Sequence, residues 1–444
     1  MQKELFSNRT LLKLILPLAA EQLLLVTVGM ADTVMVSIVG EAAVSGISLV
    51  DSINILLIQL FAALATGGAV VASQYLGRRD AANARGAAKQ LLFITTSVAT
   101  IVGIISIVFN RHILSFVFGH VEPAVMQAAE TYFWLSAASY PFLAIYNAGA
   151  ALFRSMGNSK VSLYASLLMN IVNISGNAIL IFGFGMGVAG AAIASLVSRA
   201  LAAIMVLMLL RNKSNPIYFE DLLHYRPHKG LITSILKVGV PSGVESSMFQ
   251  VGKLLLAGLI ASFGTIAITA NAITNNIASM SNIPGNAVGL ALITVVGQCV
   301  GAKDDIAARY YTKKLMKISY VSMLFINIVL FIGTDFLVSF YNSSAATTEL
   351  ARNILYISYV FNIIFWPASF SLPNALRAAG DAKYTMVTSM LSMWLCRIAM
   401  SYVLAYFGLG LTGIWIAMFL DWIVRANCFS CRFHGKKWLK SSVI

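Results

Sequence analysis

The sequence predicts an all-α integral membrane protein, with twelve transmembrane helices in two six-helix lobes related by a pseudo-two-fold axis along the membrane normal. Three observations lead to this fold class: charged residues are scarce, long apolar segments recur, and the second half of the chain repeats the first. Hydrophobic residues make up 59% of the 444 residues and charged residues only 11%, with a mean hydropathy of +0.81. A soluble domain carries about 25% charged residues, so most of this chain is expected to lie in lipid.

The expected helices follow from the length of the apolar segments. A membrane span needs about 20 largely apolar residues, and an even number of spans places both chain ends on one side. Glycine-containing connections without charge, at residues 183–187 and 408–413, are typical of tight helical hairpins. The expected spans cover residues 11–39, 44–76, 90–110, 128–153, 161–184, 188–210, 231–262, 266–299, 315–340, 350–376, 385–407 and 411–430.

The distribution of Lys and Arg indicates the orientation. These residues gather in the connections on the side of the chain ends, whereas Arg111 and Arg352 fall on the other side. Cytoplasmic loops carry the excess of Lys and Arg, so both termini are expected in the cytosol and the protein in the cytoplasmic (plasma) membrane. We interpret the net charge of +14 as a matter of topology and contact with membrane lipids, not of nucleic-acid binding. We expect a monomer.

The internal repeat has a spacing of about 224 residues. LKLILPLAAE (12–21) matches LKVGVPSGVE (236–245), and SQYLGRRDAANAR (73–85) matches GQCVGAKDDIAAR (297–309) without a gap. From Arg154 onward the spacing is 223. Each repeat begins after an even number of spans, so the two halves share one orientation, and repeats of this kind place substrate and ion sites near the midplane between them.

This repeat divides the chain into three expected regions. An N-terminal six-helix lobe covers residues 1–210, a cytosolic linker covers 211–230, and a C-terminal six-helix lobe covers 231–444. The linker is the only long polar segment between spans.

Polar residues inside the first lobe predict an ion site. A charge at the bilayer centre costs at least ~2.5–3.5 kcal/mol, so each one needs a partner or a function. At a rise of ~1.5 Å per residue from the hairpins, Asp32, Asn177 and Ser195 lie at one depth, with Asn173 one turn below Asn177. A carboxylate beside amide and hydroxyl oxygens suits a proton or a small hard cation. A capping role for Asp32 is the alternative, and Asp51 lies at a similar depth with a facing that the sequence leaves open.

Polar residues inside the second lobe predict a substrate cavity. Amide and hydroxyl side chains recur on one face of the span at 266–299, and such a stripe either lines a cavity or holds helices together. The preceding span adds an acid, an amide and a lysine. The predicted cavity residues are Glu245, Gln250, Lys253, Asn271, Asn275, Ser279 and Asn282.

Arg397 and Asp421 are expected to form a structural ion pair. Each lies about twelve residues from the last hairpin, so the two opposite charges are level in the membrane.

Nothing in the sequence indicates an enzyme. The histidines all lie in loops or chain ends, no nucleophile motif or phosphate-binding loop occurs, and CFSC (428–431) is a lone pair of cysteines. A structural metal site needs a second pair. We therefore expect no catalytic residue, no metal site and no cofactor.

Several segments resemble the multidrug and toxic compound extrusion (MATE) transporters, in the same order along the chain. They are PLAAEQLLLVTVGMADTVMVSIVGEAAVSG (17–46), VVASQYLGRRDAANARGAA (70–88), IFGFGMGVAGAAIAS (181–195) and GIWIAMFLDWIVRA (413–426). The resemblance implies two six-helix lobes that export mostly cationic, amphipathic compounds, driven by inward flow of H⁺ or Na⁺.

The resemblance also implies an ion site. The acid that related members carry on the first span matches Asp32, and the hydroxyl of their sixth span matches Ser195. An Asn and an Asp four residues apart on the fifth span match Asn173 and Asn177, so the second acid is missing here. One branch of the MATE family has a glutamate at the position of Phe249. Because this chain lacks that acid, the second-lobe ion site of that branch is in doubt here.

We therefore predict a cation-coupled (H⁺ or Na⁺) antiporter for amphipathic, cationic drugs or metabolites. Asp32 binds the ion from outside, its neutralisation changes the packing of nearby helices, and the lobes alternate in access. The alternative is a flippase for a lipid-linked or other amphiphilic substrate, which Lys253 and Arg199 keep open.

Overall fold

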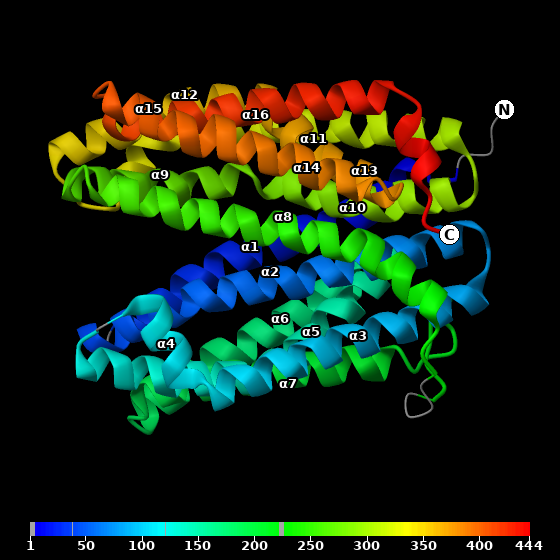
Figure 1. Ribbon diagram of the computed structural model, residues 1–444, viewed down its shortest axis with the longest axis horizontal. Coiled ribbons are helices and arrows are strands. Elements are labelled where there is room, and N and C mark those ends of the chain that lie inside the picture. Colours follow the sequence, from blue (N-terminus) through cyan, green and yellow to red (C-terminus); the bar gives the residue numbers. More distant parts are fainter. Residues whose placement is uncertain (1–4, 38, 120, 222–225) are drawn as a thin grey trace. The chain divides into compact units, whose positions relative to one another are not determined.

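The protein is all helical. The computed structural model describes residues 5–37, 39–119, 121–221 and 226–444, and of residues 28–34, 36 and 37 the backbone alone. Every regular element in these ranges is a helix, as Figure 1 shows, which confirms the all-α fold class. Ten helices in these ranges are long and apolar enough to cross a membrane, or eleven when the bent pair Ala345–Ile364 and Pro367–Ala378 is one span. The count of twelve spans stays a prediction.

The first half of the chain contains seven α-helices and one π-helical turn, η1. They are α1 (Asn8–Ser37), α2 (Glu41–Gly77), α3 (Ala81–Val108), α4 (Asn110–Phe118), α5 (Pro123–Ser155), α6 (Ser159–Asn177), η1 (Ala178–Gly183) and α7 (Gly187–Leu209).

The second half follows the same plan with more breaks. Its elements are α8 (Lys229–Ala261), α9 (Thr265–Ser281), α10 (Ile283–Gly301), α11 (Asp305–Ser339), α12 (Ala345–Ile364), η2 (Pro367–Ser371), α13 (Leu372–Ala378), α14 (Ala382–Ser392), η3 (Met393–Ala399), α15 (Met400–Tyr406), α16 (Gly410–His434) and η4 (Lys437–Ser441). Pro284 is the second residue of α10, and Pro367 begins η2. A proline removes a backbone donor and disfavours a continuous helix before it, so two of the expected spans consist of separate segments.

The helices form two compact units, which we call the first and second lobes. The first lobe comprises Ala20–Gly243, and the second comprises Met1–Ala19 together with Val244–Ile444. These bounds differ from the expected ones, because the beginning of α1 belongs to the second lobe and the beginning of α8 to the first.

A proline precedes each point at which a helix changes lobe. Pro17 lies inside α1, two residues before the bound at Ala19, and Pro241 lies inside α8, two residues before the bound at Gly243. A proline inside a helix removes one backbone hydrogen bond and bends the axis. The position of each proline accounts for the change of packing partners between the two segments of one helix.

Small residues let the helices of the first lobe approach closely. There α5 packs against α2, α3 and α7. A Cβ added at Gly67 on α2 would lie 2.5 Å from the carbonyl oxygen of Ile235 on α8, so only glycine fits. Because lipid offers no hydrophobic driving force between helices, their association depends on such close van der Waals packing.

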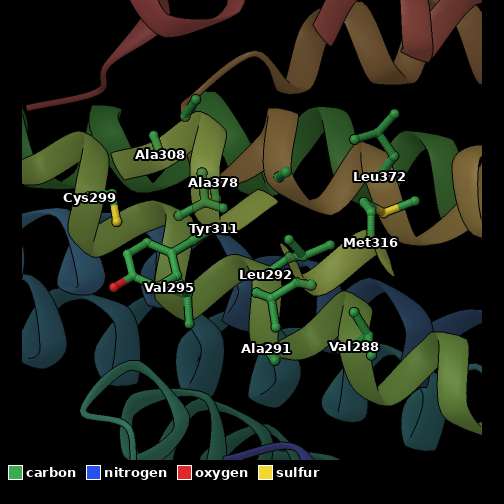
Figure 2. Close-up of a cluster of buried hydrophobic side chains, with 14 of the residues drawn as sticks. Val288, Ala291, Leu292, Val295, Cys299, Ala308, Tyr311, Met316, Leu372 and Ala378 are labelled. Atoms are coloured by element: carbon green, nitrogen blue, oxygen red, sulfur yellow. The ribbon is translucent and has the colours of Figure 1, made fainter. Parts of the chain in front are cut away.

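The second lobe has two clusters of buried apolar residues, and Figure 2 shows part of one of them. Val288, Leu292 and Val295 of α10 pack with Met316 of α11 and Leu372 of α13. The beginning of α1 joins this cluster through Leu11, Leu14, Ile15 and Leu18, all of which are buried. These leucines and isoleucine explain why the first turns of the chain belong to the second lobe.

The repeat is visible in the turns of the backbone. Arg79 and its counterpart Lys303 both adopt a left-handed conformation, with φ of 63° and 57°. Each precedes an aspartate that caps the next helix: Asp80 accepts a hydrogen bond of 3.0 Å from a backbone N–H of α3, and Asp304 one of 2.8 Å from α11. The same turn is therefore built twice.

Candidate functional site

Each lobe encloses a cavity lined by polar residues. The cavity of the first lobe has a volume of about 290 Å³ and lies between α2, α5, α6 and α7. Its lining residues are Val44, Ile47, Ser48, Asp51, Tyr132, Met169, Asn170, Asn173, Asn177, Ala191, Ser195, Ser198 and Arg199.

Three residues predicted from the sequence meet in this cavity. The amide of Asn173 donates a hydrogen bond of 3.0 Å to the hydroxyl of Ser195, and the amide of Asn177 donates one of 3.4 Å to the Asn173 side-chain oxygen. Asn173 and Asn177 are four residues apart and therefore share one face of α6. The structure brings these three side chains together; their role in ion coupling stays a prediction.

Asp51 is a carboxylate of the same cavity. It accepts a hydrogen bond of 3.2 Å from Asn54, whose side-chain oxygen in turn accepts one of 2.7 Å from the hydroxyl of Tyr140. Arg199, which also lines the cavity, donates a hydrogen bond of 2.6 Å to Ser139. The first lobe thus holds a hydrogen-bonded carboxylate in a cavity that also contains an arginine.

The side chain of Asp32, the predicted ion-binding acid, lies outside the described residues. Leu256, the residue 224 positions later in the repeat, lines the cavity of the second lobe. The role of Asp32 in ion binding stays a prediction.

The cavity of the second lobe is larger, with a volume of about 450 Å³. Residues of α8, α9, η2, η3 and α16 surround it, together with Asn282 and Trp366. Its lining residues are Phe249, Lys253, Leu256, Ala257, Ile260, Asn271, Asn275, Ala278, Ser279, Asn282, Trp366, Phe370, Arg397, Ile414, Trp415, Met418 and Trp422.

The polar stripe predicted from the sequence lies along this cavity. Asn271, Asn275, Ser279 and Asn282 all line it. The side-chain oxygen of Asn271 accepts a hydrogen bond of 3.1 Å from the indole of Trp415 on α16. The stripe therefore both lines the cavity and joins two helices, so the two interpretations left open by the sequence apply together.

Two cations stand at one wall of the second cavity. The Lys253 ammonium lies 5.1 Å from the ring centre of Phe249, and the Arg397 guanidinium lies 5.0 Å from the same ring. Attraction between a cation and the face of an aromatic ring contributes about 0.5–2 kcal/mol. The ring therefore stabilises both charges.

The ion pair expected between Arg397 and Asp421 is present. Arg397 Nη2 lies 2.9 Å from Asp421 Oδ2, and both residues are buried. The hydroxyl of Ser392 donates a hydrogen bond of 2.6 Å to Asp421 Oδ1. Because Arg397 also lines the cavity, the pair is part of the candidate site as well as of the helix packing.

Glu245 and Gln250, predicted to line the cavity, are not among its lining residues. The carboxylate of Glu245 is instead held in an ion-pair cluster, with Arg377 Nη2 at 2.7 Å and Arg425 Nη2 at 3.6 Å. Two cations that stabilise this buried carboxylate keep it in the helix interface. These contacts join helices far apart in sequence, and they explain why Glu245 is absent from the cavity lining.

The first lobe has the corresponding ion pair at the repeat-related positions. Arg154 Nη1 lies 3.6 Å from Glu21 Oε1, and the hydroxyl of Ser162 donates a hydrogen bond of 2.7 Å to Glu21. Glu21 and Arg154 are the counterparts of Glu245 and Arg377. The acid conserved between the two repeats of this chain is thus a packing element in both lobes.

Sequence reasoning missed the aromatic wall of the second cavity. Trp366, Phe370, Trp415 and Trp422 all line it, and the rings of Trp366 and Phe370 stack with a centroid distance of 5.0 Å. The available signal was composition: tryptophans gather in the second half of the chain, where all but Trp134 are found.

Comparisons with known proteins agree with this architecture. A sequence model of the MatE family matches residues 17–179 and, a second time, residues 241–403, which coincide with the two repeats. An "Uncharacterized transporter YisQ" of Bacillus subtilis (strain 168) is 26% identical, over 98% of this chain and 96% of the relative. A "Probable multidrug resistance protein NorM" of Thermotoga maritima is also 26% identical, over 98% of this chain and 94% of the relative.

A solved structure shares the fold. It is described as the outward-facing conformation of a multidrug resistance MATE family transporter of the MOP superfamily. The TM-score is 0.90 at 19% sequence identity, over 98% of this chain and 96% of the other.

Proposed function

Because this chain belongs to the MatE family of transporters, we propose that it is an ion-coupled antiporter that exports amphipathic aromatic compounds by alternating access. The observation that carries the proposal is the first-lobe cavity, where Asp51 lies with amide and hydroxyl groups of α6 and α7. A carboxylate at membrane depth is costly when it is charged and unpaired. Such a group is retained where its charge has a function.

In this mechanism a proton or Na⁺ enters the first-lobe cavity and binds to a carboxylate, either Asp32 or Asp51. Binding removes the negative charge that Arg199 and the polar groups otherwise stabilise. A ligand changes an equilibrium between two conformations only by binding one of them more tightly. Neutralisation of the acid supplies that difference, because the hydrogen bonds around Asp51 join α2 to α5.

The volume of the second cavity favours export of small molecules over the flippase alternative. Pockets for drug-sized ligands measure about 300–1,000 Å³, and this cavity of about 450 Å³ lies within that range. Its aromatic wall suits flat, apolar ring systems.

Transport by the full-length protein in liposomes tests the ion-coupling proposal. We expect an imposed pH or Na⁺ gradient to drive a fluorescent amphiphile, and Asp32→Asn or Asp51→Asn to lower this transport by about tenfold or more. Dansylcadaverine, which is cationic, and dansyl-6-aminohexanoate, which is anionic, cover both substrate charges.

Asp335→Asn is the matched control, because Asp335 is an exposed carboxylate that pairs with Arg352 at 3.6 Å. This variant should transport like the wild type. Undiminished gradient-driven transport in both the Asp32 and the Asp51 variants would refute the assignment of the ion site to the first lobe.

A further inference from the structure

The charges of the second lobe do not balance around its cavity. Both buried carboxylates near it are already paired. Glu245 is held by Arg377 at 2.7 Å and by Arg425 at 3.6 Å, and Asp421 is held by Arg397 at 2.9 Å. Three arginines thus stabilise two carboxylates before Lys253 is considered.

Lys253 adds a further positive charge at the wall of the cavity. In the part of the chain whose side chains the structure describes, no carboxylate oxygen lies within 4.0 Å of its ammonium. The nearby charged group is instead Arg397, which shares the Phe249 ring with it. Two like charges on one ring repel each other, and a bound anion would relieve this repulsion.

No described residue that lines the second cavity is acidic. A cationic ligand would therefore meet Lys253 and Arg397 without a carboxylate to neutralise it. The first cavity differs in this respect, because Asp51 lines it. Complementary potential favours one sign of ligand and opposes the other, and in the second lobe the favoured sign is negative.

The remaining walls are aromatic or apolar. Trp366, Phe370, Trp415 and Trp422 provide ring faces and edges, and Leu256, Ile260, Ile414 and Met418 fill the spaces between them. Aromatic pairs contribute about 0.5–1.5 kcal/mol beyond the burial of their area. A ligand with a flat ring system and one acidic group would use all of these surfaces.

We propose that the second-lobe cavity binds an aromatic organic anion, such as a carboxylate or sulfonate. Lys253 and Arg397 hold the acidic group, and the tryptophan wall holds the rings. The inference names the substrate class of the proposed export function. Binding of the anion follows from the cavity itself, and only the direction of its transport rests on the proposed function. It replaces the expectation of a cationic substrate for this cavity.

Two probes that differ only in the charged end test the proposal. Dansylcadaverine and dansyl-6-aminohexanoate carry the same fluorophore on similar chains, but end in an ammonium and a carboxylate. Energy transfer from tryptophan reports their binding to the purified full-length protein, because Trp366, Trp415 and Trp422 line the cavity. We expect the anion to bind at least about tenfold more tightly than the cation.

Substitutions at Lys253 assign the preference to this side chain. Lys253→Met should weaken binding of the anion by about tenfold or more, and Lys253→Arg should retain most of it. Lys237→Met is the matched control, because Lys237 is exposed on the same helix and does not line the cavity; it should bind like the wild type. Equal affinity of the wild type for both probes, or unchanged binding of the anion in Lys253→Met, would overturn the proposal.

A second variant covers the case in which Lys253→Met fails to fold. Asn275→Asp adds a carboxylate to the cavity and retains both cations. It should weaken anion binding and strengthen binding of dansylcadaverine, and the absence of both changes would contradict the inference.

Binding needs no ion gradient, so this proposal and the export function can fail separately. Binding of the anion that depends on Lys253, without gradient-driven transport of either probe, supports the anion site and refutes ion-coupled export. Gradient-driven transport of the cation without anion binding supports ion-coupled export and refutes the anion site.

Discussion

The two cavities are lined at equivalent positions of the repeat, yet their chemistry differs. The acid Asp51 corresponds to the amide Asn275. The hydroxyl of Ser195 corresponds to the thioether of Met418, and Arg199 corresponds to Trp422. The equivalent lining pairs are Ile47 and Asn271, Asp51 and Asn275, Ala191 and Ile414, Ser195 and Met418, and Arg199 and Trp422. The positions that line the cavity are the same in both lobes, and the side chains at these positions differ.

This divergence teaches that the fold depends on features outside the cavities. The left-handed turns at Arg79 and Lys303 recur, and so do the ion pairs of Glu21 with Arg154 and of Glu245 with Arg377. A site can change its charge while these elements hold the helices. Substitutions that copy one lobe into the other measure how far the two lobes are interchangeable.

The largest effect is expected at the Arg397–Asp421 pair, whose first-lobe counterparts are Ile174 and Ser198. Arg397→Ile alone leaves the fully buried Asp421 without its cation. Breaking a buried pair in this way costs about 3–5 kcal/mol of the free energy of unfolding, measurable by denaturation in micelles.

The double variant Arg397→Ile with Asp421→Ser reproduces the first-lobe residues and removes both charges. It should regain a large part of the lost stability, since apolar replacement of a buried pair is often nearly neutral. A double variant as unstable as the single one would show that the second lobe needs the charges themselves.

A smaller effect is expected where helices cross at Gly67. Its counterpart in the second lobe is Ala291, which is fully buried and already carries a Cβ. Gly67→Ala places that atom 2.5 Å from the backbone of Ile235 and should cost about 1–3 kcal/mol.

The reverse change, Ala291→Gly, should cost only about 0.5–1 kcal/mol, the usual penalty of glycine inside a helix. Thermal unfolding of the two variants gives the comparison. Equal losses of stability would mean that the close approach of α2 and α8 is not specific to the first lobe.

The smallest effect is expected at the capping residue Asp80, where the two lobes agree. Hydrogen bonds from the backbone and side chain of Asn83 lower the pKa of Asp80. A carboxyl whose pKa is lowered by folding stabilises the fold above its unfolded pKa of about 3.9. That contribution is lost as the pH falls through the lower, folded-state pKa.

Asp80→Ala should therefore lower the melting temperature slightly at pH 7, and the difference from the wild type should shrink as the pH falls below about 4. Melting curves at a series of pH values measure it. A difference that stays constant down to pH 3 would assign the effect to helix propensity instead of the charged cap.

Much of the fold was predictable because it depends on local and periodic features. Apolar length predicted the helices, and the spacing from the hairpins predicted Asn177 and Ser195 at one depth with Asn173 one turn below. In the structure it is Asn173 that donates the hydrogen bond of 3.0 Å to Ser195. The facing of Asp51 was not predictable, since the neighbouring polar residues Ser48, Ser52 and Asn54 do not define one narrow face of its helix. The partners of Glu245 lie more than one hundred residues away, and contacts at such separations leave no periodic signal.

The composition of the two lobes also bears on how the chain is made and how it arose. The second lobe includes the first nineteen residues of the chain, and the first lobe is complete only once Gly243 has been synthesised. During synthesis, neither lobe can therefore be completed from its own half of the chain alone. In a dimer of single-repeat chains, exchange of the first helices between the two copies would complete each lobe in the same way. The same reasoning implies that two half-length genes produce a folded protein only when they are expressed together.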